Sequence, residues 1–232
     1  MDITCFRKKI VAWGKENFRP YPWRLSGDPY RILIAELMLH RTQARQVSKV
    51  YEVFVSRYQD VFSLAQASEQ ELETSLYSLG LRWRTSLIRR LVLNITERFS
   101  GIVPESKEEL MSLPGVSDYV ASAVRCFAWN HPEAVIDTNT VRVVGRLYNL
   151  TTKDSSRRST RFRNLIAELV DPKEPRMYNY ALLDLADTIC TKRRLPSHSL
   201  CPVLELCLLG MAQSGGENQT IRQVECKQTT CP

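Results

Sequence analysis

Apolar residues recur every three to four residues along almost the whole chain, and this spacing predicts amphipathic α-helices. Proline and glycine fall between the apolar stretches, where they end helices and form turns. Alternation typical of β-strands is nearly absent. The stretches with helical spacing are 3–18, 29–40, 43–58, 70–79, 85–99, 107–113, 118–129, 140–147, 158–170 and 178–189. The sequence therefore predicts an all-α fold with short connections between helices.

The length of 232 residues allows one large domain or two small ones. We expect two helical lobes with a cleft between them. One lobe spans 24–130, contains six helices and ends in a helical hairpin, and the other combines 1–23 with 131–210. Residues 211–232 are polar and lack periodicity, so we expect a flexible tail there.

Two features of the sequence bear on where the protein acts. No apolar run approaches the roughly 18–20 residues that a membrane span requires. Charged residues interrupt the apolar ones near the N-terminus, which excludes the apolar core of a signal peptide. We therefore expect a monomer in the cytoplasm, associated with the nucleoid and not with a membrane.

The chain carries 32 Lys and Arg residues against 25 Asp and Glu residues, which gives a net charge of +7. This balance fits basic proteins of many kinds, and it also suits binding to a polyanion such as nucleic acid. Trp83, between two of these basic residues, belongs either to the core, which we favour, or to a stacking contact. Eight arginines, some of them merely solvated, are candidates for a salt-sensitive contact with DNA: Arg82, Arg84, Arg89, Arg90, Arg157, Arg158, Arg161 and Arg163.

Five of the seven cysteines lie in residues 190–232, namely Cys190, Cys201, Cys207, Cys226 and Cys231. A disulfide framework is not expected in a chain without a secretory signal. Clustered cysteines in a cytoplasmic protein indicate a metal ion or an iron–sulfur cluster instead.

The stretch Leu113-Pro114-Gly115-Val116 separates two predicted helices, and its proline and glycine permit a tight turn. Backbone N–H groups at the start of the second helix lack intrahelical partners and can bind a phosphate. An ordinary corner between two helices fits this stretch equally well. Further along, Asp137 follows an apolar run and precedes a helix, where an aspartate can serve as N-cap, as catalytic carboxylate, or as both.

Residues 113–124 resemble the helix-hairpin-helix motif, and Asp137 resembles the aspartate that follows this motif, in the helix-hairpin-helix (HhH-GPD) DNA glycosylases. The resemblance covers the chain from about residue 19 to about residue 207. It implies that the hairpin turn grips phosphates of the DNA backbone and that Asp137 serves base excision. Ser117 replaces a glycine usual in the family; serine tolerates a positive φ less well, although its hydroxyl adds a donor.

Tyr119 occupies the position at which bifunctional members of the family carry a lysine that forms a Schiff base. No lysine lies in residues 113–145, so the resemblance implies a monofunctional enzyme that leaves an abasic site. Asp137 would then stabilise the positively charged sugar or orient the attacking water. Glu36 is an isolated acid in an apolar helix and is the candidate that assists the departing base. The alternative for Glu36 is a place on the helix surface.

His40, Arg41, Thr42 and Gln43 resemble the base-binding segment of the branches that excise thymine or adenine. Adenine glycosylases usually show Gln-Gln-Thr-Gln here and a serine at the position of Tyr119, so the thymine glycosylases acting on G·T mismatches are more similar. The ring of Tyr119 suits packing on the sugar or base of a flipped pyrimidine, and the alternative for Tyr119 is an ordinary core aromatic. The resemblance implies that Gln43 wedges into the duplex. His40 and Arg41 either contact the flipped base or its guanine partner, or form a solvated helix end.

We therefore expect an enzyme that hydrolyses thymine or uracil from G·T and G·U mismatches in double-stranded DNA. One alternative is an adenine-DNA glycosylase acting on adenine opposite guanine or 8-oxoguanine. A second alternative is a non-catalytic DNA-binding protein, including a regulator that senses a metal.

Many members of the family hold a 4Fe–4S cluster with four cysteines separated by six, two and five residues. Cys190, Cys201 and Cys207 match the first, third and fourth of these cysteines. His198, with two residues between it and Cys201, lies near the place of the missing second cysteine. The resemblance implies a 4Fe–4S cluster with His198 as fourth ligand. A cysteine of the tail as fourth ligand, a zinc ion bound by three cysteines and one histidine, or no metal at all are the alternatives.

Overall fold

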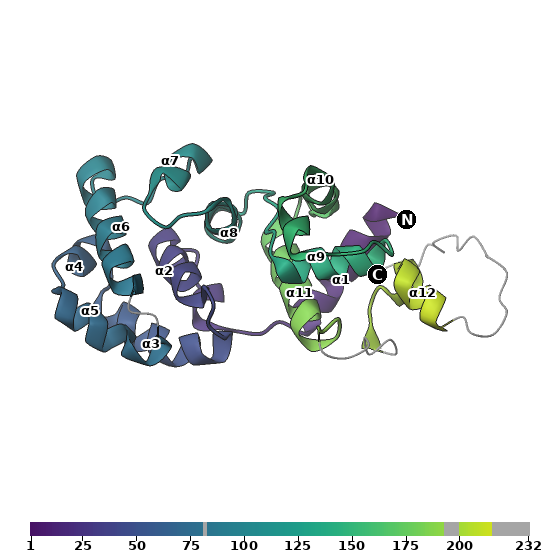
Figure 1. Ribbon diagram of the computed structural model, residues 1–232, viewed down its shortest axis with the longest axis horizontal. Coiled ribbons are helices and arrows are strands. Elements are labelled where there is room, and N and C mark those ends of the chain that lie inside the picture. Colours follow the sequence, from purple (N-terminus) through teal and green to yellow (C-terminus); the bar gives the residue numbers. More distant parts are fainter. Residues whose placement is uncertain (81–82, 193–199, 215–232) are drawn as a thin grey trace, which may run out of the picture. The chain divides into compact units, whose positions relative to one another are not determined.

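The computed structural model describes residues 1–80, 83–192 and 200–214, and its regular elements are helices (Figure 1). Within these ranges there are twelve α-helices, several short 3-10 helices and no strand, which confirms the predicted all-α class. None of the described helices is both long and apolar enough to cross a membrane.

Contacts between residues divide the chain into two units, each described here by itself. The hairpin unit comprises residues 19–135, and the aspartate unit comprises residues 1–18 with the described residues from 136 onward. The sequence placed the two breaks at 23/24 and 130/131. The structure places these breaks at 18/19 and 135/136 instead, so that the buried residues Trp23 and Val135 both fall in the hairpin unit.

The hairpin unit is built around one central helix. Its helices are α2 (Pro29–Leu39), α3 (Ala44–Arg57), α4 (Val61–Ala65), α5 (Glu69–Leu76), α6 (Trp83–Phe99), α7 (Lys107–Ser112) and α8 (Asp118–Trp129). Asp28 caps α2 by accepting hydrogen bonds from the backbone N–H groups of Tyr30 and Arg31 at 2.9 and 3.5 Å. Residues 32–38 of α2 are all buried, as expected for a helix that is apolar on every side. α2 packs against α3, α6 and α8.

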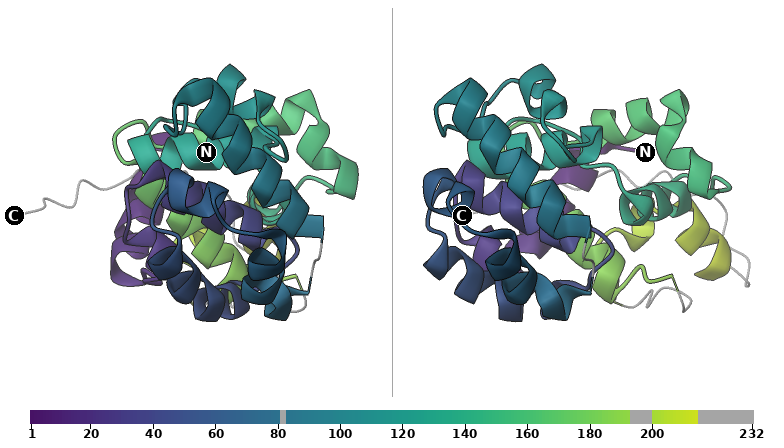
Figure 2. Two further views of the ribbon diagram at one scale, coloured as in Figure 1. Left: turned by 90° about the vertical axis from the view of Figure 1, so that its left-hand side faces the viewer. Right: turned by 60° about the vertical axis from the view of Figure 1, so that its left-hand side comes forward.

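In the aspartate unit the N-terminal helix packs against a helix from the far end of the chain. The unit contains α1 (Ile3–Glu16), α9 (Thr138–Leu147), α10 (Thr160–Leu169), α11 (Pro175–Thr188) and α12 (Leu208–Ser214). α1 and α11 lie side by side (Figures 1 and 2). A Cβ atom on Gly14 would lie 2.4 Å from the Cβ atom of Ala181, so only glycine permits this close approach.

Two elements differ from the sequence prediction. The lobe predicted with six helices has a seventh, α4, whose five residues are too few to display a helical period. α12 extends to Ser214, so residues 211–214 of the expected flexible tail are helical. Residues 215–232 lie outside the described part of the chain.

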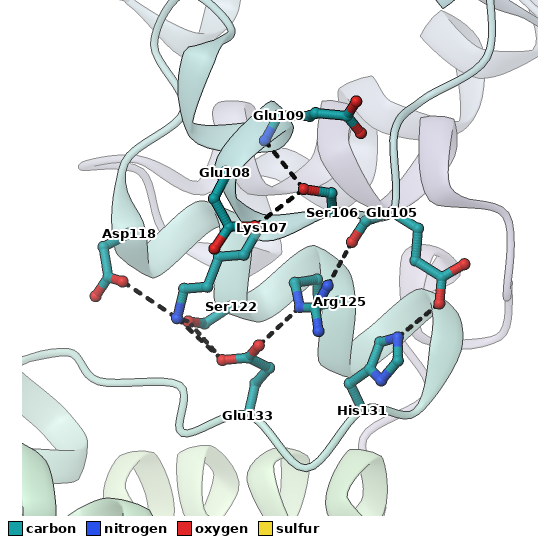
Figure 3. A network of polar contacts seen from close by, with 10 residues as sticks. All are labelled: Glu105, Ser106, Lys107, Glu108, Glu109, Asp118, Ser122, Arg125, His131 and Glu133. Carbon is teal, nitrogen blue, oxygen red and sulfur yellow. Dashed lines mark hydrogen bonds and ion pairs between the residues drawn. The ribbon is translucent and has the colours of Figure 1, made fainter.

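A network of charged side chains joins α7 and α8 to the segment that follows α8 (Figure 3). The Glu133 carboxylate accepts hydrogen bonds from Arg125 Nε at 2.7 Å, Lys107 Nζ at 3.0 Å and Ser122 Oγ at 3.3 Å. Lys107 also pairs with Asp118 at 3.2 Å. Burial raises the pKa of Glu133, but the hydrogen bonds from Lys107 and Arg125 outweigh burial and hold this pKa below its ordinary value.

We predict that Glu133→Gln destabilises the protein by about 1–3 kcal/mol at neutral pH, because the network loses its charged acceptor. The carboxylate of the folded protein has a lowered pKa, so acid favours unfolding through this group. Above about pH 4.5, the ordinary pKa of a glutamate, the variant is therefore less stable than wild type by the full amount. This difference in the free energy of unfolding disappears as the pH falls through the lowered pKa of Glu133. Thermal unfolding at pH 7 and in acid measures both effects.

Glu105→Gln is the matched control, since Glu105 pairs with His131 in the same region but is more exposed. We expect a smaller loss there. Equal stability of wild type and the Glu133 variant at pH 7 would contradict the role of the network.

Candidate active site

Asp137 begins α9 and uses both of its carboxylate oxygens in hydrogen bonds. Oδ1 accepts from the backbone N–H groups of Asn139 and Thr140, each at 2.8 Å, and Oδ2 accepts from Asn139 Nδ2 at 2.7 Å. Thr140 Oγ1 in turn accepts from the backbone N–H of Asp137 at 2.9 Å, which completes a capping box. Asp137 is therefore an N-cap. The residue is partly exposed, and these hydrogen bonds hold its carboxylate in one orientation.

A chain of hydrogen bonds on one face of α9 connects Asp137 to the end of α11. Arg142 donates from Nη1 to Asn139 Oδ1 at 2.9 Å, and Asn139 holds Asp137. The same guanidinium donates to the carbonyl oxygens of Ala186 at 2.8 Å and Cys190 at 2.9 Å. Sequence reasoning missed Asn139 and Arg142 as supports of the site. Their spacing of three residues places both side chains on one face of α9 and could have indicated this supporting role.

One turn further along α9, Arg146 contacts two of the cysteines in the predicted cluster. Its Nη1 lies 3.2 Å from Cys190 Sγ, and Cys207 Sγ lies 3.5 Å from the carbonyl oxygen of Arg146. Burial is the largest cause that raises the pKa of Cys201 and of Cys207, and the Cys190 thiol raises both further.

A metal site is not complete in the described residues. Among them, no three His, Cys, Asp or Glu side chains converge as metal ligands. His198, Cys226 and Cys231, the candidates for a fourth ligand, lie outside the described part of the chain. Cys190, Cys201 and Cys207 therefore supply donors of the right chemistry for iron or zinc, but not by themselves a site that fits the metal.

The predicted hairpin is formed by α7, a tight turn and α8. Leu113 and Val116 are 3% and 7% exposed, and the turn closes with a hydrogen bond from Val116 N to the Leu113 carbonyl oxygen at 3.2 Å. Gly115 has a φ of +79°, and a Cβ atom there would lie 2.6 Å from the side chain of Leu87. The positive φ favours glycine at 115, and any larger residue there would also require the Leu87 side chain to move.

Ser117 does not carry the backbone cost that its replacement of glycine suggested. Its φ is −83°, an ordinary value for serine, and its Oγ accepts a hydrogen bond from Val120 N at 3.3 Å. Ser117 is the N-cap of α8 and is exposed. N–H groups at the start of a helix, together with the helix dipole, suit a phosphate. Tyr119, the second residue of α8, is partly exposed.

Glu36 lies inside the hairpin unit. It is 4% exposed and sits on α2 between buried apolar residues, so the surface position considered from the sequence is wrong. Asp137 belongs to the aspartate unit. Tyr119, the hairpin turn and the 40–43 segment share the hairpin unit with Glu36.

The 40–43 segment connects α2 to α3. His40, Arg41 and Gln43 are exposed, and Thr42 is partly buried. Gln43 is the N-cap of α3, but its side chain makes no capping hydrogen bond. The pKa of His40 lies below its ordinary value because of partial burial and because Arg41 and Arg84 are nearby, so the ring is neutral at pH 7.

Two residues near this segment differ from the sequence prediction. Trp83 was expected in the core but is 44% exposed, with its ring in edge contact with His40 at 5.6 Å between centroids. Arg84 was counted among the candidate surface contacts with DNA but is 1% exposed. The neighbouring Trp83 and Arg84 at the start of α6 gave no indication in the sequence of which side chain faces inward. Arg82 lies outside the described residues.

Comparison with known proteins places this geometry in a family. Residues 34–168 match the HhH-GPD superfamily base excision DNA repair proteins. A thymine/uracil-DNA glycosylase of Pyrobaculum aerophilum is 35% identical over 208 residues, which cover 88% of this chain and 90% of the relative. An adenine DNA glycosylase of Rattus norvegicus is 32% identical over 89% of this chain and 42% of its own length.

A solved structure of a thermostable thymine-DNA glycosylase superimposes with a TM-score of 0.83 at 28% identity, covering 90% of this chain and 97% of that one. The resemblance inferred from the hairpin and Asp137 is thereby confirmed at the level of the family. The chain belongs to the HhH-GPD superfamily of base excision DNA repair proteins.

Proposed function

We propose that the protein is a monofunctional DNA glycosylase that removes thymine or uracil from G·T and G·U mismatches in double-stranded DNA. The observation that carries this proposal is Asp137, a partly exposed residue whose carboxylate is fixed at the start of α9 by three hydrogen bonds. The similarity to a thymine/uracil-DNA glycosylase over nearly the full length of both chains supports the choice of base.

The proposed reaction separates into binding and chemistry. The N–H groups at the start of α8 and the turn at Gly115 hold a phosphate of the DNA backbone. The mismatched nucleotide flips out of the DNA duplex, and this costs less free energy than flipping a correctly paired nucleotide. The 40–43 segment contacts the opened duplex, and Tyr119 packs against the flipped base.

In the chemical step, the bond between the sugar C1′ and the base nitrogen breaks, and its electron pair leaves with the base. Asp137 stabilises the positive charge that develops on the sugar. A water molecule adds to C1′ and loses one proton, and the base gains one proton, with Glu36 assisting the departing base. Tyr119 has no amine with which to form a Schiff base, so the DNA strand remains intact at the abasic site.

A panel of duplexes tests both the activity and the target base. We expect release of base from G·T and G·U under single-turnover conditions, with strand breaks only after alkali. Asp137→Asn should reduce the rate at least about 100-fold, because the amide carries no negative charge. Asparagine is as good an N-cap as aspartate, so α9 should stay folded.

Asp171→Asn is the matched control, since Asp171 Oδ1 also accepts backbone N–H bonds, from Lys173 and Glu174. Its rate should match wild type. Release only from duplexes with adenine opposite guanine or 8-oxoguanine would assign the adenine branch instead. Tight DNA binding without release of base from any duplex would favour the non-catalytic DNA-binding protein. Strand breaks without alkali would contradict the monofunctional mechanism.

The support of Asp137 by Asn139 predicts a second effect. Asn139→Ala removes the hydrogen bond to Asp137 Oδ2 and the link to Arg142. We expect the rate of base release to fall about 10-fold, as for the loss of one hydrogen bond to a charged group, with duplex affinity unchanged. Asn94→Ala is the control, since Asn94 accepts from Arg98 on the exposed face of α6. Equal rates for both variants would exclude a role for Asn139.

We further propose that Cys190, Cys201 and Cys207 hold a 4Fe–4S cluster with His198 as fourth ligand. The cluster would supply a structural link at the end of α11 and take no part in the chemical step. Metal and sulfide analysis of the purified protein should find four iron atoms and four sulfides per chain. Cys190→Ser should lose them, whereas Cys126→Ser, at a cysteine buried in α8, should not. One zinc ion per chain would favour the zinc alternative, and absence of metal would overturn the proposal.

A further inference from the structure

The first turn of α6 contacts the end of α2 through Arg84. The Nη2 atom of Arg84 donates a hydrogen bond to Thr42 Oγ1 at 2.8 Å and another to the carbonyl oxygen of His40. The neighbouring Trp83 ring meets the His40 ring edge to face. One guanidinium therefore bridges the residues before and after Arg41.

Arg84 is a costly residue to bury in this way. It is 1% exposed, makes no ion pair with a carboxylate in the described residues, and its Nε and Nη1 atoms are buried without a hydrogen-bond partner. A buried cation without a counter-ion, and buried N–H groups without acceptors, both oppose folding. An apolar side chain of similar length would avoid these costs. Stability alone does not explain an arginine here.

The position of the two acceptors indicates what the guanidinium does. Arg41 has a φ of +61°, in the left-handed region that a side chain with a Cβ atom disfavours. The His40 carbonyl and the Thr42 hydroxyl flank this residue on either side, and both are held by Arg84. With the turn held, the side chains of His40, Arg41 and Gln43 are all exposed.

We propose that Arg84 is a positioning residue that locks the left-handed turn at Arg41 and so fixes the 40–43 segment for contact with the opened duplex. This inference rests on the proposed function for its DNA-binding part. The lock itself is a property of the protein alone and can be measured without DNA.

Limited trypsin digestion measures the lock directly, because Arg41 is an exposed trypsin site inside the held turn. Arg84→Met should accelerate cleavage between Arg41 and Thr42 several-fold, and Thr42→Val should do so to a smaller extent. The double variant should add little to Arg84→Met, since both changes break one interaction. Arg98→Met is the matched control, because Arg98 lies on the same helix, was not among the candidate contacts with DNA, and donates to Ser112 Oγ at 3.1 Å.

Single-turnover base release from G·T duplexes measures the consequence for DNA. We expect the rate at saturating enzyme to fall about 10- to 100-fold in Arg84→Met, as for the loss of hydrogen bonds from a charged donor. The affinity for a fully paired duplex should change less than about threefold, because non-specific binding depends on phosphate contacts elsewhere. Arg84→Lys keeps the charge without the planar fork and should recover part of the rate.

The outcomes separate the inference from the proposed function. Unchanged trypsin cleavage and an unchanged rate in Arg84→Met would overturn the lock. The inference would also be overturned if Arg84→Met lowered the melting temperature, the affinity for the paired duplex and the rate together, and Arg84→Lys restored none of them. Arg84 would then have only a general structural role. If wild type releases no base from any duplex, the proposed function fails, while faster cleavage at Arg41 in the variant would still establish the lock.

Discussion

The hydrogen bonds around the Asp137 carboxylate are the interaction on which the rest of the candidate site depends. The same contacts that cap α9 also fix the orientation of both carboxylate oxygens. The positive end of the helix dipole favours negative charge at this place. An isolated carboxylate on a loop would have to be ordered when DNA binds. Here the cost of ordering is met when the helix folds.

The support of this carboxylate extends well beyond its neighbours in sequence. Asn139 and Arg142 tie Asp137 to the carbonyl oxygens at the end of α11, and α11 is packed against α1. The position of one side chain thus depends on helices from both ends of the chain. In the hairpin unit, Arg84 acts in a comparable way, since it joins α6 to the turn after α2. In both cases an arginine reaches backbone carbonyl oxygens that no helix satisfies.

Much of this arrangement could be predicted from the sequence. Helical periodicity identified the all-α class and most helices, and the Leu-Pro-Gly-Val turn and Asp137 identified the family. The signals failed where they were short or depended on packing. α4 has too few residues to show a period, and neighbouring basic side chains do not reveal that Arg84 is buried whereas Trp83 is exposed. Ser117 adopts a negative φ, which only the conformation of the turn could reveal.

The pairing of α1 with α11 also constrains the order in which the protein can fold during synthesis. The hairpin unit is one continuous stretch of chain, so all of its contacts become available once residue 135 has emerged from the ribosome. α1 emerges first from the ribosome, yet Gly14 has to await Ala181 before its close contact can form. The aspartate unit therefore has to close a long loop of sequence, a slow step, after the hairpin unit is already complete. Until then the apolar face of α1 is exposed, which makes the nascent chain a candidate for chaperone binding.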